Sequence, residues 1–184
     1  EGSHNAVPLI AGINDGEGLF FIRPSRTFET VEQQHAARVE EFGEYSGGLL
    51  DMYVADSNED IYRIEVDYNT DSWFARPTRE ILNAMARTKE DSYMYLFTRN
   101  LSDPEERSPH AMELMYVFNT LPSGASNEDL EIAKLMNNYW VEFAKSGTPN
   151  RFELPQWPVY DIERETHQIL DVEVGQGVQF RTQE

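Results

Sequence analysis

The sequence predicts an α/β fold in which strands and helices alternate and pack in layers. Two short runs are typical of buried strands, the apolar segment 7–13 and the aromatic segment 92–98. Segments whose apolar residues recur at helical spacing lie between these strands and after them. Such alternation favours a layered α/β architecture over one that separates helices from strands. With 184 residues, 40% of them hydrophobic, the chain can build one sizeable core.

The first predicted strand ends in a turn that carries a carboxylate. The run Val7-Pro8-Leu9-Ile10-Ala11-Gly12-Ile13 is followed by Asn14-Asp15-Gly16, and Glu17 lies just beyond it. Residues 27–45 then have the apolar spacing of an amphipathic surface helix, and Thr30 with Gln33 could form a capping box. Two further short helices are expected at 49–54 and 58–68. We interpret these helices as lid or cap elements.

The middle of the chain places a histidine after the second predicted strand. Residues 71–86 have helical spacing and should pack on a sheet, because Pro77 lies near the helix start, where proline is tolerated. Strand 92–98 is followed by a polar loop, 99–108, and then by His110. Loops that follow strands are where an open α/β sheet presents its functional groups.

A long helix and a hairpin complete the predicted elements. Residues 127–145 have helical spacing, and Gly147 and Pro149 end the helix. The remainder, to Arg181, predicts a hairpin about Gly175 and Gly177. We expect core packing rather than pocket lining from the aromatic residues of this half, because aromatic stripes usually bury themselves. They are Trp140, Phe143, Trp157 and Tyr160.

Composition excludes several classes of function. The chain has 33 acidic and 15 basic residues, and its net charge of −18 repels phosphate backbones and anionic lipid surfaces, which argues against nucleic acid as a partner. Cysteine is absent, so there is no disulfide framework, thiolate nucleophile or cysteine-based metal site. No apolar run approaches the ~18 residues of a membrane helix. Asn100-Leu101-Ser102 is a formal glycosylation sequon of little weight.

Several motifs, in order, resemble the type B carboxylesterase and cholinesterase family of α/β hydrolases. The segment from Val7 to Asn14, with Glu17-Gly18 and Phe21, is similar to the family segment that bears the triad acid. His110 through Phe118 is similar to the base segment. Four segments near the carboxyl end resemble the closing signature of the family: Tyr139-Trp140, Phe143-Ala144, Gly147-Thr148-Pro149-Asn150 and Trp157-Pro158-Val159-Tyr160.

The resemblance implies that residues 1–184 form the carboxyl-terminal portion of a single α/β-hydrolase domain with a central, mostly parallel sheet. It implies that Glu17 is the triad acid and His110 the general base. The nucleophile is missing, because the serine of this fold sits in a G-x-S-x-G elbow and the chain contains none. An amino-terminal segment outside this chain is therefore expected to supply the serine and the oxyanion hole. This chain alone should be inactive.

The implied function is a serine carboxylic-ester hydrolase that works through an acyl-enzyme, with a small-molecule ester as substrate and neither metal nor organic cofactor. Either the parent was cleaved and its pieces remain associated, or this chain is one part of a longer one. A second hypothesis is a non-catalytic, cholinesterase-like binding or adhesion protein. A third, a free-standing small domain, would leave sheet edges exposed. The lack of cysteines favours a microbial source over an animal cholinesterase.

Some residues have competing interpretations. Asp15 could replace Glu17 as the acid, although the family register favours Glu17. Glu113, three residues after His110, has a spacing that a metal site could use on a helix. The other histidines, His4, His35 and His167, show no paired ligand spacing. Asp71 is interpreted as a helix-capping residue, and Ala111 stands where many relatives have glycine. An ester pocket could be lined by Phe20, Phe21, Met112, Met115 and Phe118.

Overall fold

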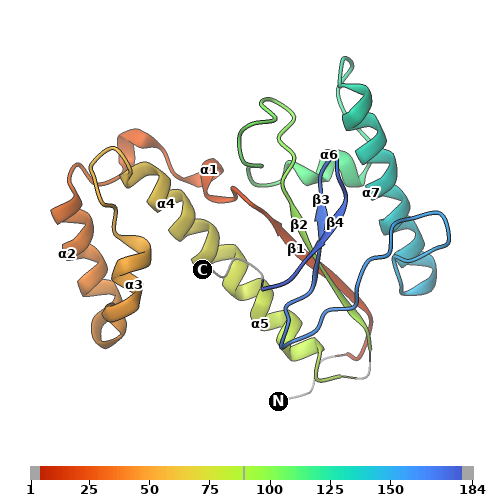
Figure 1. Cartoon of the computed structure of the whole chain (residues 1–184), viewed down its shortest axis with the longest axis horizontal. Coiled ribbons are helices and arrows are strands. Elements are labelled where there is room, and N and C mark those ends of the chain that lie inside the picture. The colour runs from red at the N-terminus through yellow and green to blue at the C-terminus, as the bar shows by residue number, and fades with distance from the viewer. Residues whose placement is uncertain (1–4, 89, 180–184) are drawn as a thin grey trace.

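The computed structural model describes residues 5–88 and 90–179 and contains one four-stranded sheet with helices on both faces (Figure 1). The strand order follows the chain, β1 (Leu9–Asn14), β2 (Ser92–Phe97), β3 (His167–Leu170) and β4 (Gly175–Gly177). The first three strands are parallel and only β4 is antiparallel. This confirms the predicted layered α/β class with a mostly parallel sheet.

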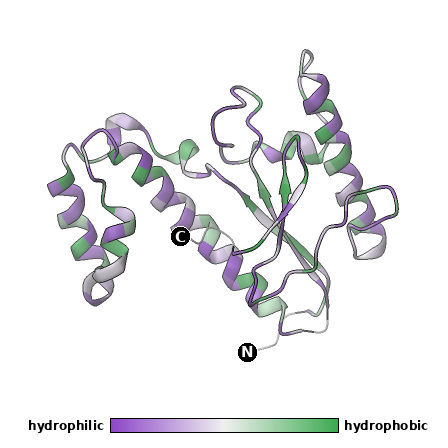
Figure 2. Cartoon of the chain, viewed as in Figure 1, coloured by the Kyte–Doolittle hydropathy of each residue, from purple (hydrophilic) through white to green (hydrophobic). Residues whose placement is uncertain are grey.

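Strand β2 is buried because each of its faces meets a different hydrophobic cluster. Tyr93 and Phe97 belong to a cluster that includes helix α7 (Asn127–Ser146). Met94 points the other way, into a cluster with Leu82 of helix α5 (Arg76–Met85). Successive strand side chains alternate between faces, so a strand covered on both sides reads as continuously hydrophobic. Figure 2 shows this as hydrophobic colour along the central strands.

Three of the four aromatic residues that the sequence assigns to the core rather than to a pocket pack there, whereas Trp140 also lines an apolar groove between α7 and the helix α6 (Glu113–Val117). Trp157 is fully buried, and its indole nitrogen donates to the Met94 carbonyl at 2.9 Å. Tyr160 is also buried, whereas Trp140 and Phe143 are half-buried and pack against the α7 side of the core. The hydrogen bond to a β2 carbonyl satisfies the indole N–H, which explains how so large a side chain can be buried completely.

Helices α2 (Val31–Phe42) and α3 (Ser46–Tyr53) form a hairpin that packs beside α4 (Ile61–Thr70), away from the sheet (Figure 1). The Thr30 hydroxyl accepts from the Gln33 amide at 3.3 Å, as the capping-box prediction requires. The Gln33 side chain, however, accepts from the Glu29 amide. An ion pair between buried Arg38 of α2 and Glu65 of α4 holds the hairpin to α4, and Arg38 also pairs with Glu41 within its own helix.

The helices predicted at 58–68 and 71–86 are joined without a loop. A π-helical turn, Asp71–Ala75, connects α4 directly to α5 and gives a continuous rod from Ile61 to Met85. Asp71 does not cap a helix; its carboxylate accepts a hydrogen bond from Tyr53 at 3.1 Å. The remaining short elements are α1 (Gly18–Phe21), the 3₁₀ turns Pro24–Arg26 and Gly43–Tyr45, and α6 (Glu113–Val117).

The carboxyl-terminal predictions are close to the structure. Helix α7 begins after Ser126, whose side chain accepts from the Asp129 amide, and ends at Gly147 with φ of 78°. The hairpin is present, but Gly175 and Gly177 lie in its second strand rather than in its turn. Gly177 is required there because a Cβ would lie 2.2 Å from the His167 ring. Arg181 lies outside the described residues.

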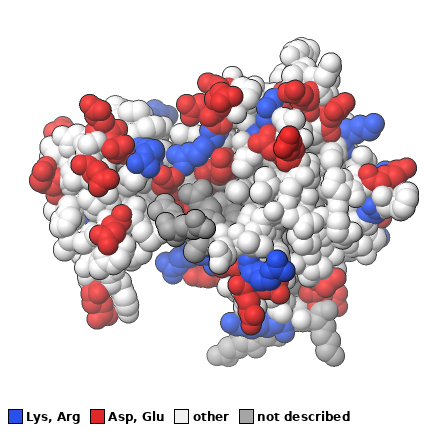
Figure 3. Space-filling view, viewed as in Figure 1, with Lys and Arg blue, Asp and Glu red and all other residues white. Residues whose placement is uncertain are grey.

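Charge is distributed rather than concentrated. On the face in Figure 3, Asp and Glu side chains cover both the helical hairpin and the sheet-bearing part, with Lys and Arg interspersed among them. In the described part of the chain, no helix is long and apolar enough to cross a bilayer.

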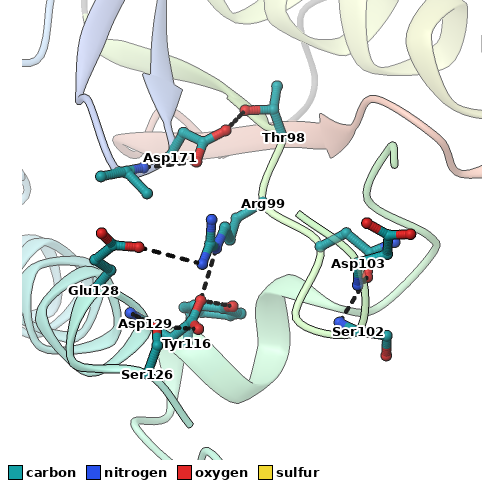
Figure 4. Close-up of polar contacts among 11 residues, drawn as sticks. Thr98, Arg99, Ser102, Asp103, Tyr116, Ser126, Glu128, Asp129 and Asp171 are labelled. Atoms are coloured by element: carbon teal, nitrogen blue, oxygen red, sulfur yellow. Dashed lines mark hydrogen bonds and ion pairs between the residues drawn. The ribbon is translucent and has the colours of Figure 1, made fainter. Parts of the chain in front are cut away.

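A buried ion pair joins the end of β2 to the start of α7 (Figure 4). The Arg99 guanidinium donates to Asp129 at 2.7 Å, and both side chains are almost fully buried. Tyr116 and Ser126 also donate to the Asp129 carboxylate. Burial opposes the charge of Asp129, but these hydrogen bonds outweigh it and lower its pKa to about 2. The network therefore fixes the chain on either side of the 99–108 loop.

This network predicts part of the acid sensitivity of folding. The pKa of Asp129 is depressed from 3.8 to about 2, so its stabilisation is complete above pH 3.8 and is lost as the pH falls through about 2. Its loss should cost about 2 kcal/mol. In urea titrations between pH 5 and pH 2, the advantage of the wild type over Asp129→Asn should shrink by that amount. A constant difference would contradict the assignment, and Asp56→Asn, an exposed change, is the control.

Candidate active site

The carboxylate of Glu17 is held in the loop that follows β1. Its Oε1 atom accepts a hydrogen bond from the main-chain N–H of Asn14, the last residue of β1, at 2.9 Å. Glu17 is only 5% exposed and immediately precedes helix α1. The main chain around it is fixed as well, because Gly18 N–H donates to the Thr70 hydroxyl at 2.9 Å. The acid is therefore anchored from both sides.

His110 lies in the loop that follows the neighbouring strand. Strands β1 and β2 pair in parallel with Asn14 opposite Phe97, so their following loops leave the same edge of the sheet. An isolated parallel bridge between Gly16 and Pro109 continues this pairing up to the residue before His110. Asp15 helps to hold the loops together by accepting from the Ser108 N–H at 2.7 Å. Asp15 therefore binds the main chain of the loop that carries His110.

The two site residues predicted from the sequence meet directly, although 93 positions separate them. Glu17 Oε2 lies 2.5 Å from His110 Nδ1. The Glu17 side chain is 6% exposed, whereas that of His110 is 38% exposed. A buried carboxylate on Nδ1 fixes the imidazole orientation and leaves Nε2 available to a third group. Such a pair can serve as acid and base for a nucleophile placed at Nε2.

Burial and hydrogen bonding act in opposite directions on Glu17. Burial raises the pKa of this carboxyl above its usual value. The Asn14 N–H and the His110 ring both favour the ionised form and limit that rise. The negative charge of Glu113 adds slightly to it. Glu113 thus lies near the pair, and its own carboxylate accepts a hydrogen bond from the Asn14 side chain.

Asn14 is a site residue to which the sequence assigns no role of its own, since it is predicted only as part of a turn and of the segment that resembles the acid-bearing motif. Its side-chain amide donates to the Pro109 carbonyl at 2.7 Å and to Glu113 Oε2 at 2.6 Å. Asn14 is fully buried. A polar residue that ends an apolar strand just before the acid was the available signal.

Aromatic rings surround the imidazole. The ring centroids of Phe74, Phe21 and Phe20 lie 5.0, 5.2 and 5.8 Å from that of His110. Phe21 also contacts Trp73, which is 60% exposed. Phe20 and Phe21 were predicted to line a pocket, whereas Trp73 and Phe74 were assigned only to packing on the sheet. The π-helical turn, which sequence spacing does not reveal, brings this second pair to the site.

The other predicted pocket residues lie elsewhere. Met112 and Met115 pack against the α7 side of the core. Phe118 is 67% exposed and lines a separate apolar groove between α6 and α7. Ala111 has a φ of 65°, in the left-handed region where glycine is favoured.

Two other sequence signals do not define sites in the described part of the chain. No group of three or more His, Cys, Asp or Glu residues is arranged there to hold a metal, and the Glu113 carboxylate binds Asn14 instead. His4 lies outside the described residues. The sequon residue Asn100 is 8% exposed, and its amide nitrogen donates to the Arg107 carbonyl. That amide is occupied within the fold, which argues against glycosylation of the folded chain.

A mostly parallel sheet between helices, with an acid and a histidine in the loops after adjacent strands, is the architecture of an α/β hydrolase. The chain belongs to the carboxylesterase family, whose model matches residues 1–184. It is 28% identical to para-nitrobenzyl esterase of Bacillus subtilis (strain 168), over 95% of this chain and 36% of that protein. It is 25% identical to cocaine esterase of Homo sapiens, over 94% of this chain and 35% of that protein.

A solved structure, of PNB esterase, supports the same fold. It superimposes with a TM-score of 0.75 at 27% identity, and the match covers 95% of this chain and 36% of that one. The chain therefore spans about a third of the length of the relatives it matches.

Proposed function

We propose that this chain supplies the acid and the base of a serine carboxylic-ester hydrolase. The observation that carries the proposal is the 2.5 Å contact between Glu17 Oε2 and His110 Nδ1. Membership of the carboxylesterase family supports the reaction class. The substrate would be a small carboxylic ester, and the rings around His110 offer an apolar surface for part of it.

The proposed mechanism uses His110 twice. Its Nε2 takes the proton from the attacking serine hydroxyl, and the imidazolium then protonates the departing alcohol. Water, activated by the same nitrogen, resolves the acyl-enzyme and regenerates the serine. Glu17 holds the imidazole in the required tautomer and stabilises its charged form.

We further propose that residues 1–184 are the carboxyl-terminal portion of one domain, and that an amino-terminal segment of the same hydrolase carries the serine and the oxyanion hole. Two features support an associated segment. Strand β1 is the first strand of the sheet order, so among the described residues its outer edge has no neighbour. The groove between α6 and α7, about 320 Å³, is lined by exposed Leu114, Phe118 and Val141. Unpaired edges and apolar patches of this kind favour association.

A labelling experiment tests this proposal. The chain produced alone should neither hydrolyse a p-nitrophenyl ester nor react with a fluorophosphonate probe, because it lacks the nucleophile. The same chain combined with the amino-terminal portion of its parent should do both, with the label on a serine outside residues 1–184. Absence of labelling in the combined protein would refute the esterase proposal and leave a binding role.

A further inference from the structure

Asn14 contacts the acid, the base loop and a second carboxylate at once. Its main-chain N–H donates to Glu17 Oε1 at 2.9 Å. Its side-chain amide donates both hydrogens, one to the Pro109 carbonyl at 2.7 Å and one to Glu113 Oε2 at 2.6 Å. Pro109 immediately precedes His110, so a single residue ties the loop of the acid to the loop of the base.

Burying the Asn14 side chain costs free energy of folding, which argues that the hydrogen bonds donated by its amide have a role. Asn14 has no exposed surface, and its Oδ1 atom is buried without a hydrogen-bond partner among residues 5–88 and 90–179. A buried polar atom without a partner is destabilising and rare in folded proteins. An apolar residue at the end of β1 would avoid that cost, but it would leave the Pro109 carbonyl and the Glu113 carboxylate without this donor.

We infer that Asn14 is a positioning residue that sets the geometry of the His110–Glu17 pair. The inference rests on the proposed esterase function. The hydrogen bond from the Asn14 side chain to the Pro109 carbonyl fixes the position of the His110 loop relative to the end of β1. The main-chain N–H bond to Oε1, which any residue except proline would supply, turns the Glu17 carboxylate so that Oε2 faces the imidazole, and the Asn14 side chain adds the bonds to Pro109 and Glu113.

Asn14 also keeps the second carboxylate in its place. Glu113 lies close enough to Glu17 for its charge to raise the Glu17 pKa. The charges of Glu113 and Glu17 both raise the pKa of the nearby Tyr95 hydroxyl as well. The Asn14 amide donates to Glu113 Oε2 at 2.6 Å and so keeps the Glu113 carboxylate on Asn14. Holding it on Asn14 leaves a single acid facing His110 Nδ1.

The first test is Asn14→Ala in the complete hydrolase. Because small misplacements of catalytic groups are costly, kcat should fall by about 10- to 100-fold while KM changes by less than about threefold. Asn150→Ala is the matched control. The Asn150 side chain also makes two hydrogen bonds, as a donor to the Trp157 carbonyl and as an acceptor from the Trp157 N–H, and it follows α7 rather than the strands whose loops carry Glu17 and His110. This variant should keep the wild-type kcat even if its unfolding temperature falls.

Asn14→Asp provides a nearly isosteric second test. An ionised carboxyl cannot donate, whereas a protonated one can donate a single hydrogen. The activity of Asn14→Asp relative to wild type should therefore be highest at low pH and fall as the pH rises. The downfield proton resonance of the Nδ1–H of His110 should broaden or shift in both Asn14 variants and stay unchanged in Asn150→Ala.

These outcomes separate the two proposals. If the wild-type complete protein does not turn over esters, the esterase proposal fails, and the proton resonance still tests the positioning role. If both Asn14 variants fold and retain the wild-type kcat, pH profile and resonance, the inference is wrong. It is also wrong if neither variant folds, since Asn14 would then serve the fold and not the geometry of the pair.

Discussion

Replacing His110 by alanine is expected to lower kcat of the complete hydrolase by about 10⁴-fold or more, with no loss of folded protein. The imidazole is 38% exposed and belongs to neither hydrophobic core cluster, so its removal changes contacts with the rings of Phe20, Phe21 and Phe74 but leaves the core intact. Without the imidazole, nothing accepts the proton of the attacking serine. The rate should be measured with a p-nitrophenyl ester, alongside circular dichroism to verify the fold.

Glu17→Gln should also reduce kcat severely while preserving the shape of the site. The amide has the size of the carboxylate, but it can present an N–H to Nδ1 and so favour the wrong imidazole tautomer, and it cannot stabilise the imidazolium. When two residues act as a unit, the losses in rate from substituting each of them do not add. A double variant that combines His110→Ala with Glu17→Gln should therefore be no slower than His110→Ala alone.

Exposed residues on α2 provide matched controls. His35→Ala and Glu40→Gln make the same chemical changes on the helical hairpin, and both should retain the wild-type rate. Activity of His110→Ala within tenfold of wild type would remove His110 from the mechanism. Additive losses in the double variant would show that Glu17 acts independently of the imidazole.

The sequence predicted the main elements because their signals are local. Strand β2 is aromatic along its length, and α7 has a serine cap and a closing glycine, so both were located within a residue or two. Helix α2 was predicted too long, because Thr27–Glu29 have helical spacing but precede the Thr30 cap. Local spacing also could not reveal that α4 and α5 form one rod, since a π-helical turn has no composition of its own.

The site was only half predictable for a related reason. Glu17 and His110 were identified by resemblance of motifs, but their 2.5 Å contact depends on the parallel pairing of β1 with β2, which is a long-range property. Asn14 and Phe74 were missed because each also has an ordinary local explanation, as a turn residue and as a helix packing residue. Tertiary structure gives them their second role.

Gly18→Ala is expected to destabilise the fold strongly although it adds only one methyl group. A Cβ on Gly18 would lie 2.3 Å from the Val66 carbonyl oxygen and 3.0 Å from the Val66 Cα. Both are backbone atoms of α4, so no side chain can rotate away and either the helix or the acid loop must move. Overpacking of this kind typically costs 1–3 kcal/mol. We expect about 3 kcal/mol, because the Gly18 N–H bond to Thr70 would be strained as well.

The matched control is Gly48→Ala in α3, where a Cβ would meet nothing within 4 Å. Alanine is the better helix former, so this change should raise the free energy of unfolding by up to about 1 kcal/mol. In urea unfolding, the free energy of unfolding should therefore be lower than wild type for Gly18→Ala and higher than wild type for Gly48→Ala. Because Gly18 adjoins Glu17, the Gly18 change should also lower kcat below what its folded fraction explains. Unfolding free energies for Gly18→Ala equal to wild type would mean that α4 and the acid loop are not in contact, and the anchoring of Glu17 through Gly18 would be wrong.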